Sequence, residues 1–263
     1  MTDPGAPSGG EPQRAALIPR AARALRRFLT EPPYRHQLWW RLAPKADVYQ
    51  HDNVTVPDRY PRIFRFVQRE LGADSALRIL SYGCSTGEEV FSLRHYFPSA
   101  VIKGIDINPG NIAVCRRRLV ENPDRAIAFE TASSTREEPS AAYDAIFCMA
   151  VLRHGDLRLP GVTRCDHRIR FDDFARSVED FARCLKPGGL LSIRYSNFRL
   201  CDAPAGANFE AVLSVKYRVP PRYVRIFGPD NRLREGVTYP DAVFRKKTGD
   251  ASGAGTSASR SPA

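Results

Sequence analysis

The chain lacks the features that would assign it to a membrane or to a disulfide-stabilised fold. It has no run of 18 apolar residues, which excludes a helix that crosses a bilayer. Its six cysteines are widely spaced without a C-x-x-C pair, so we expect reduced thiols and neither a disulfide framework nor a metal site. The first residues lack the basic-then-apolar order of a secretory signal. These absences favour a cytoplasmic protein whose 263 residues bury one large core.

Two phosphate-binding motifs are also missing, the G-x-x-x-x-G-K-[ST] loop and the G-x-G-x-x-G turn. In their place an apolar run at 77–82 ends in a loop of small residues, Gly83 to Gly87, and a helical pattern follows at once. A strand, a tight turn and a helix N-terminus let backbone N–H groups approach a nucleotide-like ligand. The segment therefore predicts a nucleoside cofactor.

A second apolar run, 100–106, ends in the carboxylate of Asp106, about twenty residues after this loop. An acid at that place can accept hydrogen bonds from both hydroxyls of a ribose. NAD stays open as the ligand, although Glu88 and Glu89 would repel its phosphates from the helix N-terminus.

The formal charge of +11 is concentrated near the N-terminus, where 14–41 holds seven arginines and one acid, Glu31. Because this excess lies outside the cofactor-binding region, a nucleic-acid partner is disfavoured. Residues 14–29 separate into an apolar arc and an arginine arc, as an amphipathic helix does. Such a helix either packs on the main domain or contacts an anionic surface or an acidic partner. Residues 30–60 are aromatic, rich in proline and expected to be irregular.

The pattern divides the chain into four parts: a disordered tail at 1–13, the basic and aromatic segment 14–60, a main domain at 61–247 and a second tail at 248–263. Strands are expected at 77–82, 101–106, 126–131, 144–149 and 189–195, with a closing pair at 209–217 and 241–247. Helices are expected at 61–71, 87–97, 109–120 and 171–185. Regular alternation predicts an α/β fold: a doubly wound, mostly parallel, seven-stranded sheet of Rossmann-like type with a short N-terminal helical extension.

This layout resembles the class I S-adenosylmethionine-dependent methyltransferases over roughly 61–247. The loop Gly83–Glu89 is most similar to that of the chemotaxis-receptor methyltransferases. The strand around 143–152 and the run Leu185–Leu191 are also similar to the family's. The resemblance implies S-adenosylmethionine as the cofactor and a set of residues around it: Gly83, Cys84, Ser85, Thr86 and Gly87 around the methionine, Glu88 near its ammonium group, Asp106 and Ile107 at the ribose, Ala132 or Ser133 beside the adenine, and Met149 near the sulfonium.

Met149-Ala150 stands where the chemotaxis enzymes have Arg-Asn, which argues against assuming their substrate. We expect the acceptor to lie beyond the fourth and fifth strands, where His154 is the candidate general base. Arg153, His167, Tyr195 and Asn197 are the candidate substrate residues. The expected function is methyl transfer to an oxygen or nitrogen of a small-molecule or glycan-like acceptor. Two alternatives remain open: a chemotaxis-type protein carboxylate methyltransferase, and a non-catalytic module that binds an acidic partner through 14–41.

Overall fold

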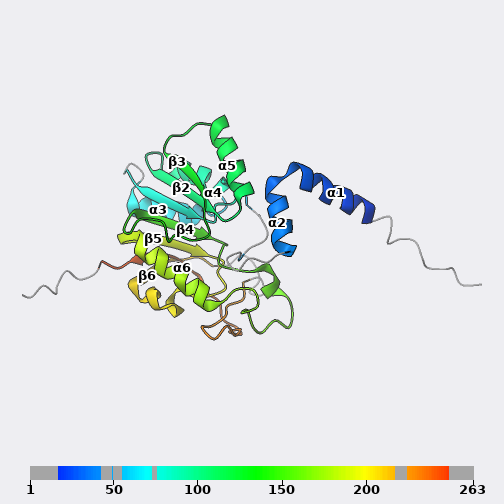
Figure 1. Ribbon diagram of the computed structural model, residues 1–263. Helices are drawn as coiled ribbons and strands as arrows, with labels where there is room; N and C mark the ends of the chain where they lie inside the picture. Colours follow the sequence, from blue (N-terminus) through cyan, green and yellow to red (C-terminus); the bar gives the residue numbers. More distant parts are fainter. Residues whose placement is uncertain (1–16, 43–48, 50–54, 73–75, 217–223, 249–263) are drawn as a thin grey trace, which may run out of the picture.

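The computed structural model describes residues 17–42, 49, 55–72, 76–216 and 224–248. Its centre is a seven-stranded sheet in the order β3-β2-β1-β4-β5-β7-β6 (Figure 1). The strands are β1 Arg78–Tyr82, β2 Val101–Asp106, β3 Ile127–Thr131, β4 Tyr143–Met149, β5 Leu185–Arg194, β6 Phe209–Ser214 and β7 Asp241–Lys246. Strands β1 to β5 pair in parallel, and β7 is antiparallel to both β5 and β6. The predicted mostly parallel α/β sheet with its closing pair is confirmed.

Helices cover both faces of this sheet. They are α1 Leu17–Thr30, α2 Pro32–Leu42, α3 Pro61–Leu71, α4 Glu88–Tyr96, α5 Pro109–Glu121 and α6 Phe171–Cys184, with short 3-10 turns η1 Gly155–Arg158, η2 Leu200–Asp202 and η3 Pro204–Asn208. Apolar side chains of α3, α4 and α5 share one buried cluster, and those of α6 belong to a second. In β1, Ile79 lies in the first cluster and Leu80 in the second, so both faces of the strand are buried.

The expectation of an irregular segment at 30–60 is wrong for 32–42, which form helix α2. Pro32 and Pro33 occupy the first turn of the helix. Backbone N–H groups in a first turn have no partner within the helix, so proline, which lacks this group, is tolerated there. The helix lies against the start of α5, where Asn108 Nδ2 donates to the Pro33 carbonyl at 3.2 Å. A Cβ atom at Gly110 would come within 2.7 Å of the Pro32 backbone, so only glycine permits this approach. Helix α2 is therefore packed against a segment that is distant in the sequence, the start of α5.

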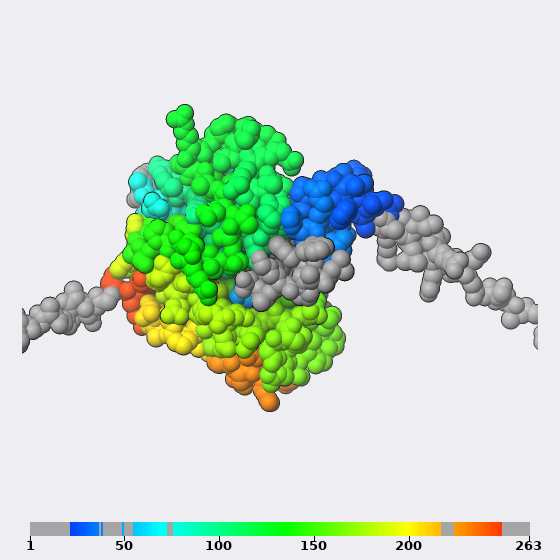
Figure 2. All heavy atoms as spheres, in the orientation of Figure 1, coloured from blue at the N-terminus to red at the C-terminus, as the bar shows by residue number. Residues whose placement is uncertain are grey.

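The N-terminal helix α1 differs from the other long helices because it projects from the body of the molecule (Figures 1 and 2). Its side chains Leu25, Phe28 and Leu29 are exposed. In the described part of the chain, no helix is long and apolar enough to span a bilayer. The two predicted tails lie outside the described residues, apart from Thr248.

Candidate functional site

The carboxyl ends of β1, β4 and β5 meet at one edge of the sheet, which we call the rim. Ala150 (φ 61°) and Tyr195 (φ 57°) directly follow β4 and β5 and have left-handed backbones, as does Ser85 (φ 52°), three residues after β1. Such backbones are costly for residues other than glycine and concentrate at binding and catalytic sites. Ligands of open α/β sheets also bind beyond the carboxyl ends of the strands. The rim is therefore the candidate active site.

The loop after β1 depends on two glycines in the left-handed region. Gly83 has φ 74° and Gly87 has φ 94°. A Cβ atom on Gly83 would lie 2.4 Å from Val151 Cγ2, so a side chain there collides with a residue that follows β4. The N–H groups of Gly83 and Cys84 donate to the Ile105 carbonyl at 2.8 and 3.0 Å. These bonds hold the loop against β2.

Asp106, the last residue of β2, is buried and fastens the loop to α5. Its carboxylate accepts hydrogen bonds from the Ser85 N–H (2.8 Å), the Asn108 N–H (2.8 Å) and Asn111 Nδ2 (2.9 Å). Burial raises its pKa, and these three donors oppose the rise. A carboxylate has about four acceptor positions, so one remains for a ligand hydroxyl. The remaining position is compatible with the ribose contact that the resemblance implies. Asp106 also holds the loop after β1 to the start of α5, which the sequence did not reveal.

The two glutamates that begin α4 face different partners. Glu88 accepts hydrogen bonds from Arg118 (2.9 Å) and Thr86 Oγ1 (2.7 Å), and Arg118 also donates to the Thr86 carbonyl. This carboxylate is thus engaged on the α5 side of the loop. Glu89 instead accepts a bond of 2.7 Å from Ser81 Oγ at the end of β1, and burial raises its pKa to about 7. Glu89 is thus a second acid beside the loop, which the sequence analysis did not single out, and the role of Glu88 near the cofactor's ammonium group stays a prediction.

The other residues expected around the cofactor lie at the same edge. The Ala132 N–H donates to the Asp106 carbonyl, and the Ser133 carbonyl accepts from Tyr82 Oη at 2.8 Å. Ile107 follows Asp106 directly, and Met149 is the buried last residue of β4. Cys84 is fully surrounded, with a pKa raised by burial, so its thiol is not a nucleophile. The topology therefore brings every predicted cofactor residue to the rim.

Two hydroxyls near the rim carry no hydrogen bond. Tyr60 Oη and Ser85 Oγ are buried without a partner among the described residues. Tyr60 precedes α3, and its position is fixed from α4: Ser92 Oγ accepts from the Asp58 N–H, and Tyr96 Oη donates to the Asp58 carboxylate. Buried polar groups are almost always satisfied, so these hydroxyls fit a ligand that supplies the missing partners. The left-handed loop, the Asp106 carboxylate and the Ser85 hydroxyl together fit a nucleoside that carries a methionine chain.

Arginine side chains lie close to the rings of Tyr60 and Tyr195. The rings of Tyr60 and Tyr195 lie 6.2 Å apart, and Arg153 and Arg194 hold their Cζ atoms 6.0 and 5.1 Å from the Tyr195 ring centre. Arg59 lies 5.3 Å from the Tyr60 ring centre. Burial lowers the pKa of Arg153. The guanidinium of an arginine nevertheless stays charged near neutral pH, because its ordinary pKa is far above 7. This group of five residues, the rim cluster, gives the site a positive and aromatic wall.

Three predicted acceptor residues take part in structural contacts or lie apart from the rim. His154 is buried, and its Nδ1 accepts from the Asp156 N–H at 3.2 Å as the cap of η1. Asn197 uses its amide to accept from the His154 N–H and to donate to the Arg225 carbonyl, both at 2.8 Å. His167 lies exposed in a turn. The structure thus joins Arg153 and Tyr195 at the rim, gives His154 and Asn197 internal partners, and leaves the proposed base role of His154 a prediction.

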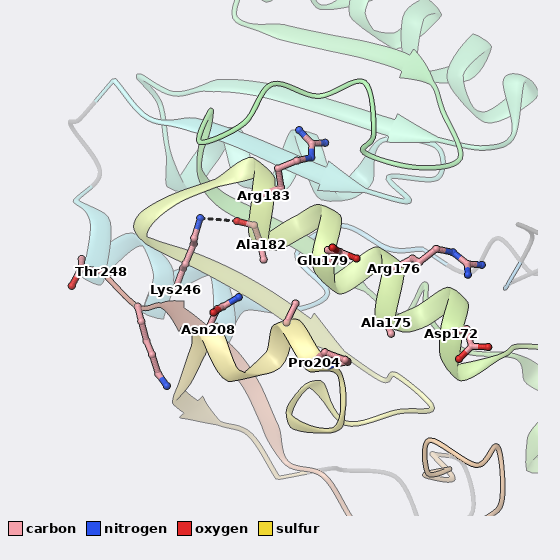
Figure 3. A pocket seen from close by; sticks show the side chains of 12 residues that line it. Asp172, Ala175, Arg176, Glu179, Ala182, Arg183, Pro204, Asn208, Lys246 and Thr248 are labelled. Carbon is pink, nitrogen blue, oxygen red and sulfur yellow. Dashed lines mark hydrogen bonds between the residues drawn. The ribbon is translucent and has the colours of Figure 1, made fainter. Parts of the chain in front are cut away.

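A groove elsewhere in the molecule runs along α6, between η3 and the end of β7 (Figure 3). Its charged side chains have mixed signs, with Asp172 and Glu179 beside Arg176 and Lys246. Lys246 Nζ donates to the carbonyls of Ala182 and Leu185, both at 2.7 Å, which closes the carboxyl end of α6. None of its lining residues belongs to the rim. The groove is separate from the cofactor site. Among the described residues no cluster of His, Cys, Asp or Glu is arranged to hold a metal ion.

Comparison with known proteins shows similarity to methyltransferases over part of the chain. Residues 80–193 match the family described as "Methyltransferase domain". Trans-aconitate 2-methyltransferase of Methylobacterium nodulans is 32% identical over 117 residues, which are 44% of this chain and 37% of the relative. An uncharacterized protein of Synechococcus is 29% identical over 51% of this chain and 29% of its own length. The matched segments thus span about a third of the curated relatives.

A solved structure was also found, phosphoethanolamine N-methyltransferase 2 of Haemonchus contortus in complex with S-adenosyl-L-methionine. It is 17% identical, with a TM-score of 0.41, over 54% of this chain and 29% of that one. The family match at 80–193 contains the loop, Asp106 and Met149, the residues on which the sequence resemblance depended. Over 80–193 the chain is thus similar to the methyltransferase domain family, in the same segment that resembles the class I S-adenosylmethionine-dependent methyltransferases.

Proposed function

We propose that this protein transfers the methyl group of S-adenosylmethionine to an oxygen or nitrogen atom of a small-molecule or glycan-like acceptor, and that a small anionic acceptor fits best. The observation that carries the proposal is the rim cluster, in which Arg59, Arg153 and Arg194 lie 5.1 to 6.0 Å from the ring centre of Tyr60 or Tyr195. A partly buried guanidinium binds carboxylate in a bidentate manner. The name of the Methylobacterium relative also designates an acidic acceptor, trans-aconitate.

The cofactor supplies a methyl group already activated on a sulfonium, so the protein's task is to bind and orient. Gly83 and Gly87 let the loop backbone approach the methionine part, Glu89 balances the ammonium charge, and Asp106 accepts from the ribose. Ala150 turns the chain sharply after Met149, with a left-handed backbone. Correct placement of two reactants supplies several kcal/mol of a barrier, roughly 7–11 at best.

The acceptor decides whether a base is required. A carboxylate oxygen has no proton to lose: it forms the new O–C bond while the C–S bond breaks and the electron pair stays on sulfur. Arg153 would hold such an acceptor, and the Tyr60 hydroxyl can donate to its second oxygen. This route makes no demand on His154, in agreement with its internal contact. An amine or hydroxyl acceptor would need a base instead.

Calorimetric titration with S-adenosylmethionine is the first test. Asp106→Asn keeps the size of the side chain and removes one acceptor, so we expect an affinity loss of about tenfold or more. Asp172→Ala, an exposed acid in the groove along α6, is the matched control and leaves affinity unchanged. A folded wild-type protein that does not bind S-adenosylmethionine contradicts the proposal. Unchanged affinity in Asp106→Asn contradicts the ribose assignment alone.

Formation of S-adenosylhomocysteine tests the acceptor class. We expect turnover with small di- and tricarboxylates, strongly reduced by Arg153→Gln and Tyr60→Phe at unchanged cofactor affinity. Turnover with the glutamates of an acidic protein, and none with small acids, favours the chemotaxis-type alternative suggested by the loop Gly83–Glu89. Cofactor binding without turnover on any acid, amine or sugar favours a non-catalytic module.

A further inference from the structure

The helix α1 carries an apolar surface that the described part of its own chain leaves uncovered. On a helical wheel its sequence, LIPRAARALRRFLT, separates into an apolar arc and an arginine arc, with Arg23, Arg26 and Arg27 on the latter. The large apolar side chains that the structure describes are exposed: Leu25 by 59%, Phe28 by 40% and Leu29 by 65%. Such a separation normally indicates a helix with one face buried. Here the apolar face, which we call the α1 arc, points to solvent.

The contacts of α1 with α2 explain why the apolar face is turned outward. The Arg27 guanidinium lies 4.3 Å from the Tyr34 ring centre, on α2, and pairs with Glu31 at 3.0 Å. Arg27 belongs to the basic face and contacts α2, whereas Arg23 and Arg26 of the same face are exposed. Figure 2 shows the result, with α1 standing out from the body of the molecule. The α1 arc is therefore presented on the outer side of a projecting helix.

The charge of α1 indicates which kind of partner could cover its apolar face. The helix contains four arginines and no aspartate or glutamate. An acidic protein would match the arginines and leave the apolar side chains in water. A second copy of this chain would cover the α1 arc and find no counter-charge in the same helix. A membrane of anionic lipids satisfies both faces, since apolar side chains enter the acyl boundary while arginines reach the phosphates.

We propose that α1 docks in the plane of an anionic phospholipid surface, with Leu25, Phe28 and Leu29 inserted at the boundary of headgroups and chains. The link from α2 to the rim is short: the Pro33 carbonyl accepts from Asn108, two residues after Asp106. Docking of α1 therefore places the cofactor site close to the lipid surface. The proposal is independent of the acceptor and of methyl transfer itself.

Co-sedimentation of the full-length protein with vesicles tests the proposal. Vesicles of phosphatidylcholine with about a third phosphatidylglycerol are compared with pure phosphatidylcholine at low and high salt. Each arginine near an anionic surface is worth about 1 kcal/mol, or roughly fivefold in binding. We expect binding to the anionic vesicles at least tenfold stronger than to the neutral ones, and weakened by salt.

Variants separate the two faces of the helix. Leu25→Ser, Phe28→Ser and Leu29→Ser together lose at least tenfold in binding, and Arg23→Gln with Arg26→Gln lose roughly 25-fold. The matched control is Val120→Ser with Leu159→Ser, two exposed apolar residues outside α1, and its binding stays at the wild-type level. Because all these side chains are exposed, thermal unfolding followed by circular dichroism should be unchanged, which shows that each variant is folded.

Three outcomes overturn the proposal. The first is a wild-type protein that does not bind anionic vesicles, and the second is a triple α1 variant that binds as the wild type does. The third is a wild-type dimer in sedimentation equilibrium that the triple variant dissociates, because a second copy would then cover the α1 arc.

Discussion

Helices α3 and α1 have the same kind of sequence and opposite surroundings. In α3 the apolar side chains Ile63, Phe64 and Val67 are at most 2% exposed, whereas Leu25, Phe28 and Leu29 of α1 are exposed by 40% or more. The pattern of each helix specifies an apolar face and does not specify what covers it. Helix α3 is covered by the sheet, through Phe147 of β4 and Tyr96 of α4, both with rings 5.5 Å from that of Phe64. The apolar face of α1 has no such cover among the described residues.

The first prediction compares a buried phenylalanine of α3, Phe64, with an exposed phenylalanine of α1, Phe28. Phe64→Ala should lower the free energy of unfolding by about 3–5 kcal/mol, because it leaves a cavity among packed rings. Phe28→Ala also removes a phenylalanine side chain, but from an exposed position, and should change the free energy of unfolding by at most about 0.5 kcal/mol. Urea unfolding of the two variants measures both. Equal losses would mean that the α1 arc is covered in solution.

The second prediction compares two left-handed glycines, one at the rim and one in a surface loop. Gly83→Ala combines the cost of a left-handed alanine with a collision against Val151, together roughly 2–4 kcal/mol. Gly161 has φ 78°, and a Cβ atom placed there would meet nothing within 4 Å, so Gly161→Ala should cost about 1–2 kcal/mol. Cofactor affinity, measured by calorimetry, should fall in the first variant and stay in the second. Adding Val151→Ala to Gly83→Ala should recover the part of the stability that the collision with Val151 costs. If stability does not recover, the collision contributes nothing to the loss.

The third prediction uses the titration of Glu89 at the rim. Its carboxylate attracts the cofactor's ammonium group only when ionised, and its pKa is about 7. Affinity for S-adenosylmethionine should therefore be constant above that pH and fall, by up to about tenfold per unit, as the pH drops below it. Calorimetry between about pH 5.5 and 7.5 brackets this pKa and measures the slope. Glu89→Gln should abolish it, and Ser81→Ala should move the inflection upward, because the Ser81 hydrogen bond lowers the pKa. A slope that survives in Glu89→Gln would assign the titration to another group.

The same shift has a consequence for stability of the unliganded protein. The pKa of Glu89 is higher in the folded chain than in the unfolded chain, so the folded state holds more protons between those two values. Its contribution to the free energy of unfolding is greatest at low pH and declines as the pH rises toward about 7.

The smallest expected effect belongs to the exposed ion pair of α1. Arg27 and Glu31 have side chains exposed by nearly half, so Glu31→Gln should cost less than about 0.5 kcal/mol. Glu138 is buried and accepts from both Lys103 and Tyr143, so Glu138→Gln should cost about 1–3 kcal/mol. Thermal unfolding distinguishes the two. A similar cost for both would show that α1 is held to the body more firmly than its exposure indicates.

Where the prediction from sequence succeeded, the signal was local and periodic. Short apolar runs predicted each of the seven strands to within a few residues, and β5 was placed late because it begins at Leu185, before its glycines. The loop glycines and Asp106 stand next to strand ends in the sequence, so the parallel topology necessarily brings them together. The prediction for helix α2 failed because its contact with Gly110 joins segments far apart along the chain.

The sequence by itself determined the sheet, the loop and the acid at its edge, because residue period and small-residue turns depend on neighbours along the chain. Only the tertiary structure decided which partners two adjacent glutamates contact, since the rotation of α4 on the sheet turns Glu88 to Arg118 and Glu89 to Ser81. It also decided that Tyr60 reaches the rim, that His154 caps a turn and that the apolar arc of α1 stays uncovered among the described residues. Each of these depends on how elements pack, and a side chain's partner across a fold leaves no mark in its local sequence.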